Sequence, residues 1–148
     1  MTDDKIRAKV QIGILKPVSE VFEAIVDPEK MKEYFISGST GKMESGKTIT
    51  WSWPDFDGEL SIKVGKIEKD KVVSFEWNGS GTNCVVVITL EAKDDKKTLV
   101  IITESDWPAD YKGAKQCMGQ VEGWTNFLCC MKAYLEYGIN LRVGAFIK

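Results

Sequence analysis

Apolar residues near the C-terminal end recur at alternating spacings of four and three, the period of one face of an α-helix. This pattern covers residues 114–139, where the apolar stripe consists of Cys117, Val121, Trp124, Leu128, Met131 and Leu135. Gly138 is placed to end the helix, because glycine adopts the left-handed conformation at little steric cost. A helix of about 24 residues is roughly 36 Å long. It must therefore pack along a large apolar surface formed by the rest of the chain.

The pattern before this helix predicts mainly strands. Apolar and polar residues alternate over residues 6–14, which indicates a half-buried strand. Two short helices are predicted next, beginning near Pro17 and Pro28, because proline is favoured in a first helical turn. Alternation returns at Thr48, and turn residues then divide the chain into further strands. These strands are predicted at about residues 48–53, 60–67, 73–77, 84–92 and 97–105.

Helices at the ends of an antiparallel run of strands are typical of an α+β fold. We expect a curved antiparallel sheet of about six or seven strands, wrapped around the long C-terminal helix, with two short helices after the first strand. The chain of 148 residues shows no internal repeat and no linker-like segment. A single domain over residues 1–148 is therefore the simplest organisation.

Composition and charge narrow the function. The net charge of −2 provides no basic surface for nucleic acid, and no apolar stretch is long enough to insert into a membrane. The charged N-terminus lacks the apolar region of a signal peptide, so we expect a cytoplasmic protein. The acids Asp55, Asp57 and Glu59 lack the spacing of a calcium loop and are expected to form a solvated turn.

The cysteines give no indication of a metal site. They include no C-x-x-C pair, and the chain contains no histidine, so neither a metal nor a cofactor is expected. We expect all of them to be reduced and to serve as small core residues. They are Cys84, Cys117, Cys129 and Cys130.

The order of elements and several motifs resemble the START-like and birch-pollen-allergen-like superfamily (SRPBCC), whose fold is the helix-grip fold. The closest likeness is to proteins related to the activator of the ninety-kilodalton heat-shock chaperone's ATPase. The motifs, in chain order, are Lys16–Ile25, Asp27–Met31, Val73–Trp77, Thr98–Glu104, Gly123–Leu128 and Tyr134-Leu135. The chain departs from the family pattern at Ser45-Gly46, where two glycines are usual, and at Lys69-Asp70, where a proline pair is usual.

This resemblance implies a deep, mostly apolar cavity between the sheet and the long helix. Members of the superfamily bind lipids, sterols, polyketides and other hydrophobic molecules in such cavities, and a minority catalyse reactions there. We therefore expect a small apolar ligand, lipid-like or aromatic, and assign no catalytic residue. The residues expected to contact it are Phe35, Trp51, Trp53, Phe75, Trp77, Glu104, Trp124, Leu128 and Met131.

The tryptophans allow two interpretations. Trp51, Trp53 and Trp77 fall at the alternating apolar positions of their strands, and Trp124 lies on the apolar stripe of the helix. All of them can therefore face one interior. They form either a well-packed core or the aromatic lining of a ligand cavity.

Glu104 also allows two interpretations. Side chains two residues apart on a strand point to the same face, so Glu104 points inward if Val100 and Ile102 do. An acid in an apolar pocket could bind a ligand or exchange protons. The alternative is a strand that has already left the core, with Glu104 in solvent. We favour solvent exposure because buried glutamate is uncommon.

Three functions are compatible with the sequence, and binding of a small hydrophobic ligand is favoured. The second is a chaperone-associated interaction module, as the family resemblance implies. The third is a cyclase- or hydrolase-like enzyme that uses Glu104 with Tyr34 or Tyr134. It is the least favoured, because a chain without histidine cannot form a Ser-His or Cys-His pair.

Overall fold

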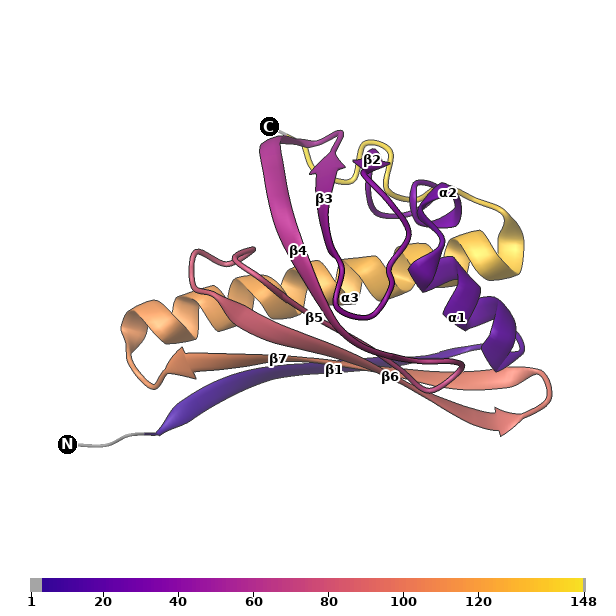
Figure 1. The fold of residues 1–148 in the computed structure, drawn as a ribbon, viewed down its shortest axis with the longest axis horizontal. Helices are drawn as coiled ribbons and strands as arrows, with labels where there is room; N and C mark the ends of the chain where they lie inside the picture. Colours follow the sequence, from indigo (N-terminus) through magenta and orange to yellow (C-terminus); the bar gives the residue numbers. More distant parts are fainter. Residues whose placement is uncertain (1–3, 148) are drawn as a thin grey trace.

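A seven-stranded antiparallel sheet curves around one long helix in the computed structural model, which describes residues 4–147 (Figure 1). The strand order is β1-β7-β6-β5-β4-β3-β2. The elements are β1 (Lys5–Ile14), α1 (Val18–Val26), α2 (Pro28–Met31), β2 (Gly38–Ser39), β3 (Thr48–Trp53), β4 (Phe56–Glu68), β5 (Val72–Trp77), β6 (Cys84–Asp94), β7 (Lys97–Pro108) and α3 (Tyr111–Tyr137). The predicted α+β helix-grip arrangement is confirmed.

The ends of α3 follow from local chemistry. The Asp110 side chain accepts a hydrogen bond of 2.8 Å from the Gly113 amide, so the helix begins before residue 114. Gly113 also allows close approach to β7, because an added Cβ would lie 1.9 Å from the Pro108 carbonyl oxygen. At the other end Gly138 has φ of 66° and terminates the helix as predicted.

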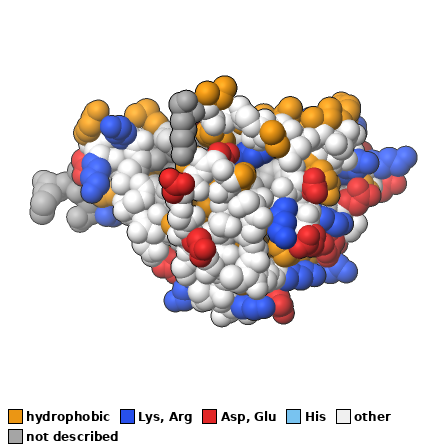
Figure 2. Space-filling model, turned by 90° about the horizontal axis from the view of Figure 1, so that it is seen from above, with side chains coloured by type: hydrophobic (Ala, Val, Ile, Leu, Met, Phe, Trp, Pro, Cys, Tyr) orange, Lys and Arg blue, Asp and Glu red, His pale blue; other side chains and the backbone are white. Residues whose placement is uncertain are grey.

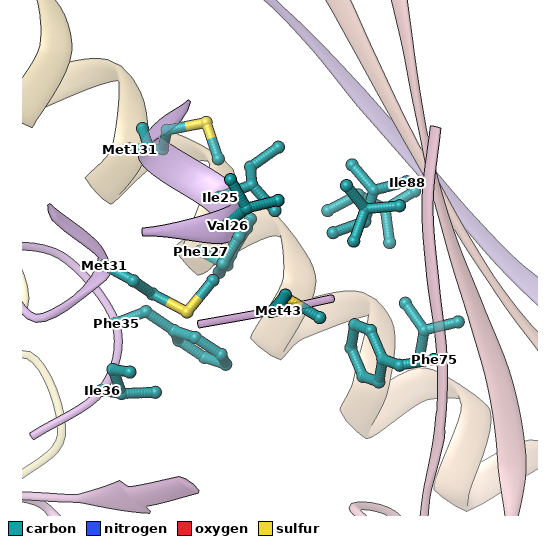
Figure 3. Packing of buried hydrophobic residues seen from close by; sticks show 14 of the residues in the cluster. Ile25, Val26, Met31, Phe35, Ile36, Met43, Phe75, Ile88, Phe127 and Met131 are labelled. Carbon is teal, nitrogen blue, oxygen red and sulfur yellow. The ribbon is translucent and has the colours of Figure 1, made fainter. Parts of the chain in front are cut away.

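The core fills much of the space between the sheet and α3. The centre of the helix buries the predicted Trp124, Leu128 and Met131, and also Phe127 and Cys130 from the flank of the stripe. Phe127 is covered by the segment after α2, because the rings of Tyr34 and Phe35 lie 5.3 and 4.7 Å from its ring. Figure 3 shows how side chains from α1, the α2 region, α3 and the sheet converge there.

The first part of α3 packs against a separate, smaller cluster. Ala8, Cys84 and Trp107 are its buried members, and Cys117 and Val121 of the helix are partly buried against them. The apolar stripe therefore contacts two different regions of the curved sheet. This contact places the start of α3 over the ends of β6 and β7.

The cysteines are distributed differently from the prediction. Cys84 and Cys130 are buried and Cys117 is half-buried, but Cys129 is exposed. The expectation that all are core residues is therefore wrong for Cys129, because adjacent helical positions point about 100° apart. Within residues 4–147 no cluster of potential metal ligands occurs, and no helix is long and apolar enough to cross a bilayer.

Candidate functional site

An open cleft of about 450 Å³ lies between α3, the start of β4 and the C-terminal segment. It is lined by Phe35, Trp53, Phe56, Asp57, Gly58, Glu59, Leu60, Trp77, Gly79, Gly119, Gln120, Glu122, Gly123, Trp124, Arg142 and Phe146. Figure 2 shows the molecule from above, with isolated acidic side chains near the middle of the view and mixed basic and acidic side chains gathered toward its right-hand side. The cleft is reached from solvent, so it differs from the deep cavity that the resemblance implied.

The structure divides the predicted ligand residues into two groups. Phe35, Trp53, Trp77 and Trp124 line the cleft. The others, Trp51, Phe75, Glu104, Leu128 and Met131, are buried outside this lining. The aromatic residues therefore form both the lining of a cleft and the packed core behind it.

The aromatic wall of the cleft consists of rings that contact one another. The Trp77 and Trp124 centroids lie 5.5 Å apart, which joins β5 to α3. Phe35 contacts Trp53 at 5.6 Å and Trp124 at 5.9 Å. Trp51 lies behind them, 6.2 Å from Trp53. These edge-to-face and tilted contacts limit the space in which each ring can turn.

Glu104 lies behind this wall with no solvent exposure, so the favoured prediction of a solvated side chain is wrong. Its Oε1 accepts hydrogen bonds of 2.7 Å from Trp124 Nε1 and 2.8 Å from Gln120 Nε2. Its Oε2 accepts a hydrogen bond of 3.0 Å from Trp77 Nε1. The carboxyl group tolerates burial because three donors replace the water it loses.

These three donors explain what Glu104 does in the site. Trp77, Gln120 and Trp124 all line the cleft, and they come from β5 and α3. Hydrogen bonding directs the indole N–H groups of Trp77 and Trp124 toward Glu104, which leaves mainly carbon atoms of these rings facing the cleft. Glu104 therefore positions the wall.

Neither tyrosine of the enzyme hypothesis is a hydrogen-bond partner of Glu104 within residues 4–147. The Tyr34 hydroxyl donates instead to the Ala24 carbonyl at 2.7 Å. Its ring stacks on that of Tyr134 at a centroid distance of 5.8 Å. Burial raises the pKa of Tyr34 well above its usual value, and Tyr134 raises it further.

Arg142, in the segment after α3, is a cleft residue that the sequence analysis missed. Its Nε and terminal amino group donate to the two oxygens of Asp55 at 2.7 and 3.1 Å. The guanidinium also lies over the Phe146 ring at 4.5 Å and the Phe35 ring at 5.4 Å. Asp55 was expected in a solvated turn, and this prediction is wrong because the C-terminal segment folds back over it.

Two glycines of α3 leave room for the cleft. An added Cβ at Gly119 or Gly123 would meet no atom within 4 Å, so no neighbouring segment requires glycine there. Gly79 differs, because its Cβ would lie 2.8 Å from the Trp77 indole. The sequence carried a signal for the helical pair, since glycines four residues apart inside a helix are costly and lie on one face.

Cys84 is expected to be inert in the folded protein. Burial raises the pKa of its thiol to about 11, and the Glu104 carboxyl contributes to the rise. At pH 8 only about one thiol in a thousand is then ionised, and the thiolate is the reactive form. Reaction with DTNB should therefore show a fast phase from exposed Cys129, whereas Cys84 should react only when the protein unfolds. A Cys129→Ser variant should lose the fast phase, whereas fast labelling of Cys84 found by mass spectrometry would contradict the assignment.

Comparison with known families identifies the class. The family described as "Activator of Hsp90 ATPase homolog 1-like protein" matches residues 16–136. Because this match covers most of the chain, the protein belongs to that family. The predicted resemblance is confirmed. No curated protein matches the sequence significantly.

Solved structures agree with this assignment. SSP2350 from Staphylococcus saprophyticus is 35% identical with a TM-score of 0.81, and the match covers 93% of this chain and 96% of that one. The Aha1 dimer from Colwellia psychrerythraea is 23% identical with a TM-score of 0.76, covering 90% and 98%. CalU16 from Micromonospora echinospora is 16% identical with a TM-score of 0.68, covering 89% and 83%. The last two show a shared fold.

Proposed function

We propose that the protein binds a small apolar molecule in the cleft, in the cytoplasm and without catalysing a reaction. The cleft volume of about 450 Å³ lies within the range of about 300–1,000 Å³ usual for small-molecule sites. Aromatic residues dominate its inner wall, and the indole N–H groups are already bonded to Glu104. An apolar ligand would therefore replace water against carbon without leaving these donors unpaired.

The observation that carries this proposal is the pair of glycines at the cleft. Glycine in a helix interior costs about 1 kcal/mol relative to alanine, and at Gly119 and Gly123 no close contact compensates for it. What these glycines provide is the open space itself. Their position is thus explained by a ligand that occupies this space.

Side chains added inside the cleft should weaken ligand binding without lowering the free energy of unfolding. In a Gly119→Leu/Gly123→Leu variant we expect affinity for an apolar probe to fall by at least about tenfold, because side chains occupy the binding volume. Stability should be maintained or rise, since leucine is a better helix former than glycine. The neutral fluorophore N-phenyl-1-naphthylamine is a suitable probe, with binding followed by tryptophan fluorescence and stability by urea unfolding.

The matched control is Thr125→Leu, which adds leucine at an exposed position of α3 outside the cleft lining. This variant should bind the probe as the unmodified protein does. Equal probe affinity in the filled variant would contradict the cleft as the site. A broad panel of apolar compounds without any effect on tryptophan fluorescence would contradict the proposed function.

A second candidate function is interaction with a chaperone. The family match supports it, because the family is described by likeness to an activator of the Hsp90 ATPase. Exposed apolar side chains at Leu141 and Val143 of the C-terminal segment offer a contact surface. Binding to purified Hsp90 at micromolar concentration, lost in a Leu141→Ser/Val143→Ser variant, would support this candidate. Absence of binding at that concentration would eliminate it.

A further inference from the structure

Carboxylates surround the entrance of the aromatic cleft. Asp57 and Glu59 come from the start of β4, and Glu122 comes from α3 on the other side. All of them are exposed, and none has an ion-pair partner within residues 4–147. The entrance therefore carries negative charge from two separate elements.

The basic residue in the lining does not offset this charge. Among the described residues that line the cleft, Arg142 is the only Lys or Arg. Its guanidinium is held in a bidentate pair by Asp55, and its side chain is only 7% exposed. Asp55 thus neutralises Arg142, and the charges of Asp57, Glu59 and Glu122 are left uncompensated.

The aromatic inner wall of the cleft also favours a positively charged ligand. The faces of Trp, Tyr and Phe rings carry negative potential, and tryptophan attracts cations most strongly. Trp53, Trp77 and Trp124 line the cleft together with Phe35. Aromatic rings on the inside and carboxylates at the entrance are the two groups that recognise an organic cation.

We propose that the ligand of this cleft is an apolar organic cation, such as an aromatic molecule that carries a quaternary ammonium group. This inference rests on the proposed binding function and specifies its ligand class. The apolar part lies against the tryptophan wall, and the positive group lies among Asp57, Glu59 and Glu122.

An anionic ligand held by Arg142 is the competing interpretation. The geometry opposes it, because one edge of the guanidinium already donates to Asp55 in hydrogen bonds of 2.7 and 3.1 Å, and the two opposite charges offset each other. An anion would have to pass Asp57, Glu59 and Glu122 at the entrance and would meet an Arg142 charge that Asp55 already offsets. Repulsion by these carboxylates therefore disfavours an anionic ligand.

Three probes of similar shape and different charge test the ligand class. They are (2-naphthylmethyl)trimethylammonium, its neutral isostere 2-neopentylnaphthalene, and 2-naphthylacetate. We expect the cation to bind at least about tenfold more tightly than the neutral isostere, and the anion to bind most weakly. Binding to the full chain is measured by tryptophan fluorescence and checked by calorimetry.

Charge neutralisation at the entrance isolates the contribution of the carboxylates. In an Asp57→Asn/Glu59→Gln/Glu122→Gln variant the preference for the cation should fall to about threefold, the part that the rings supply. The matched control is Glu20→Gln/Glu91→Gln/Asp95→Asn, which removes the same charge at exposed positions outside the cleft lining. This control should keep the preference at low and moderate salt.

The outcomes distinguish the inference from the function on which it rests. Equal affinity for the cation and its neutral isostere would overturn the inference and leave apolar binding intact. Tighter binding of the anion, or an unchanged preference in the neutralised variant, would also overturn it. Failure of all three probes to bind would overturn the inference together with the proposed function.

Discussion

Replacing Glu104 by glutamine should lower the free energy of unfolding by about 3 kcal/mol. The carboxyl group accepts three hydrogen bonds from Trp77, Gln120 and Trp124 and is fully buried. The glutamine amide keeps one acceptor oxygen and directs its own donors at the groups that bound the other oxygen. Urea unfolding measures the loss.

Two comparisons show whether the loss comes from these hydrogen bonds. Glu91→Gln changes an exposed glutamate and should stay within about 0.5 kcal/mol of the unmodified protein. A double-mutant cycle with Trp124→Phe should give a coupling of about 1 kcal/mol, because both substitutions change the two side chains that this hydrogen bond joins. A Glu104→Gln variant as stable as the Glu91→Gln control would show that the buried carboxyl is not important for folding.

Trp124→Ala should be the most damaging of the substitutions considered, at about 3–5 kcal/mol. The side chain is 3% exposed and contacts the Phe127 ring at 5.1 Å and the Trp77 ring at 5.5 Å. Alanine leaves a cavity in the centre of the contact between α3 and the sheet. It also removes the indole N–H that donates a hydrogen bond to Glu104. Thermal or urea unfolding gives the magnitude.

Trp124→Phe separates packing from hydrogen bonding. Phenylalanine keeps an aromatic ring and loses the donor, so its cost should lie well below that of alanine. Thr125→Ala, at an exposed position on the same helix, is expected to stay within about 0.5 kcal/mol. A loss for Trp124→Ala as small as that of Thr125→Ala would mean that the helix does not pack on the sheet through this residue.

Hydrophobic periodicity was sufficient to predict most of the fold. Alternation over residues 6–14 and beyond Thr48 correctly predicted strands, and the apolar stripe from Cys117 to Leu135 correctly predicted α3. Both predictions succeeded because an element that buries one face repeats its apolar residues at a characteristic spacing. The short strand Gly38–Ser39 was missed. It has too few residues to show any period, and its pairing with β3 depends on the path of the preceding turn.

The candidate site was predicted less completely than the fold. The alternation of side chains along β7 correctly predicted that Glu104 could point inward. Solvent exposure was nevertheless favoured, because buried glutamate is rare. The donors that make its burial possible lie on β5 and α3, and their convergence cannot be seen in the local pattern. The pair of Arg142 and Asp55 was missed for the same reason, since 87 residues separate them.

The amino-acid sequence by itself determined the longer helices and strands, their order and the family, because these depend on residue types and motifs that can be recognised along the chain. Only the tertiary structure decided which tryptophans line the cleft and which lie in the core. It also decided that Glu104 holds the cleft wall and that Asp55 neutralises Arg142. These features depend on curvature of the sheet and on long-range contacts, where small changes in direction determine whether a side chain meets a ligand, a partner or water.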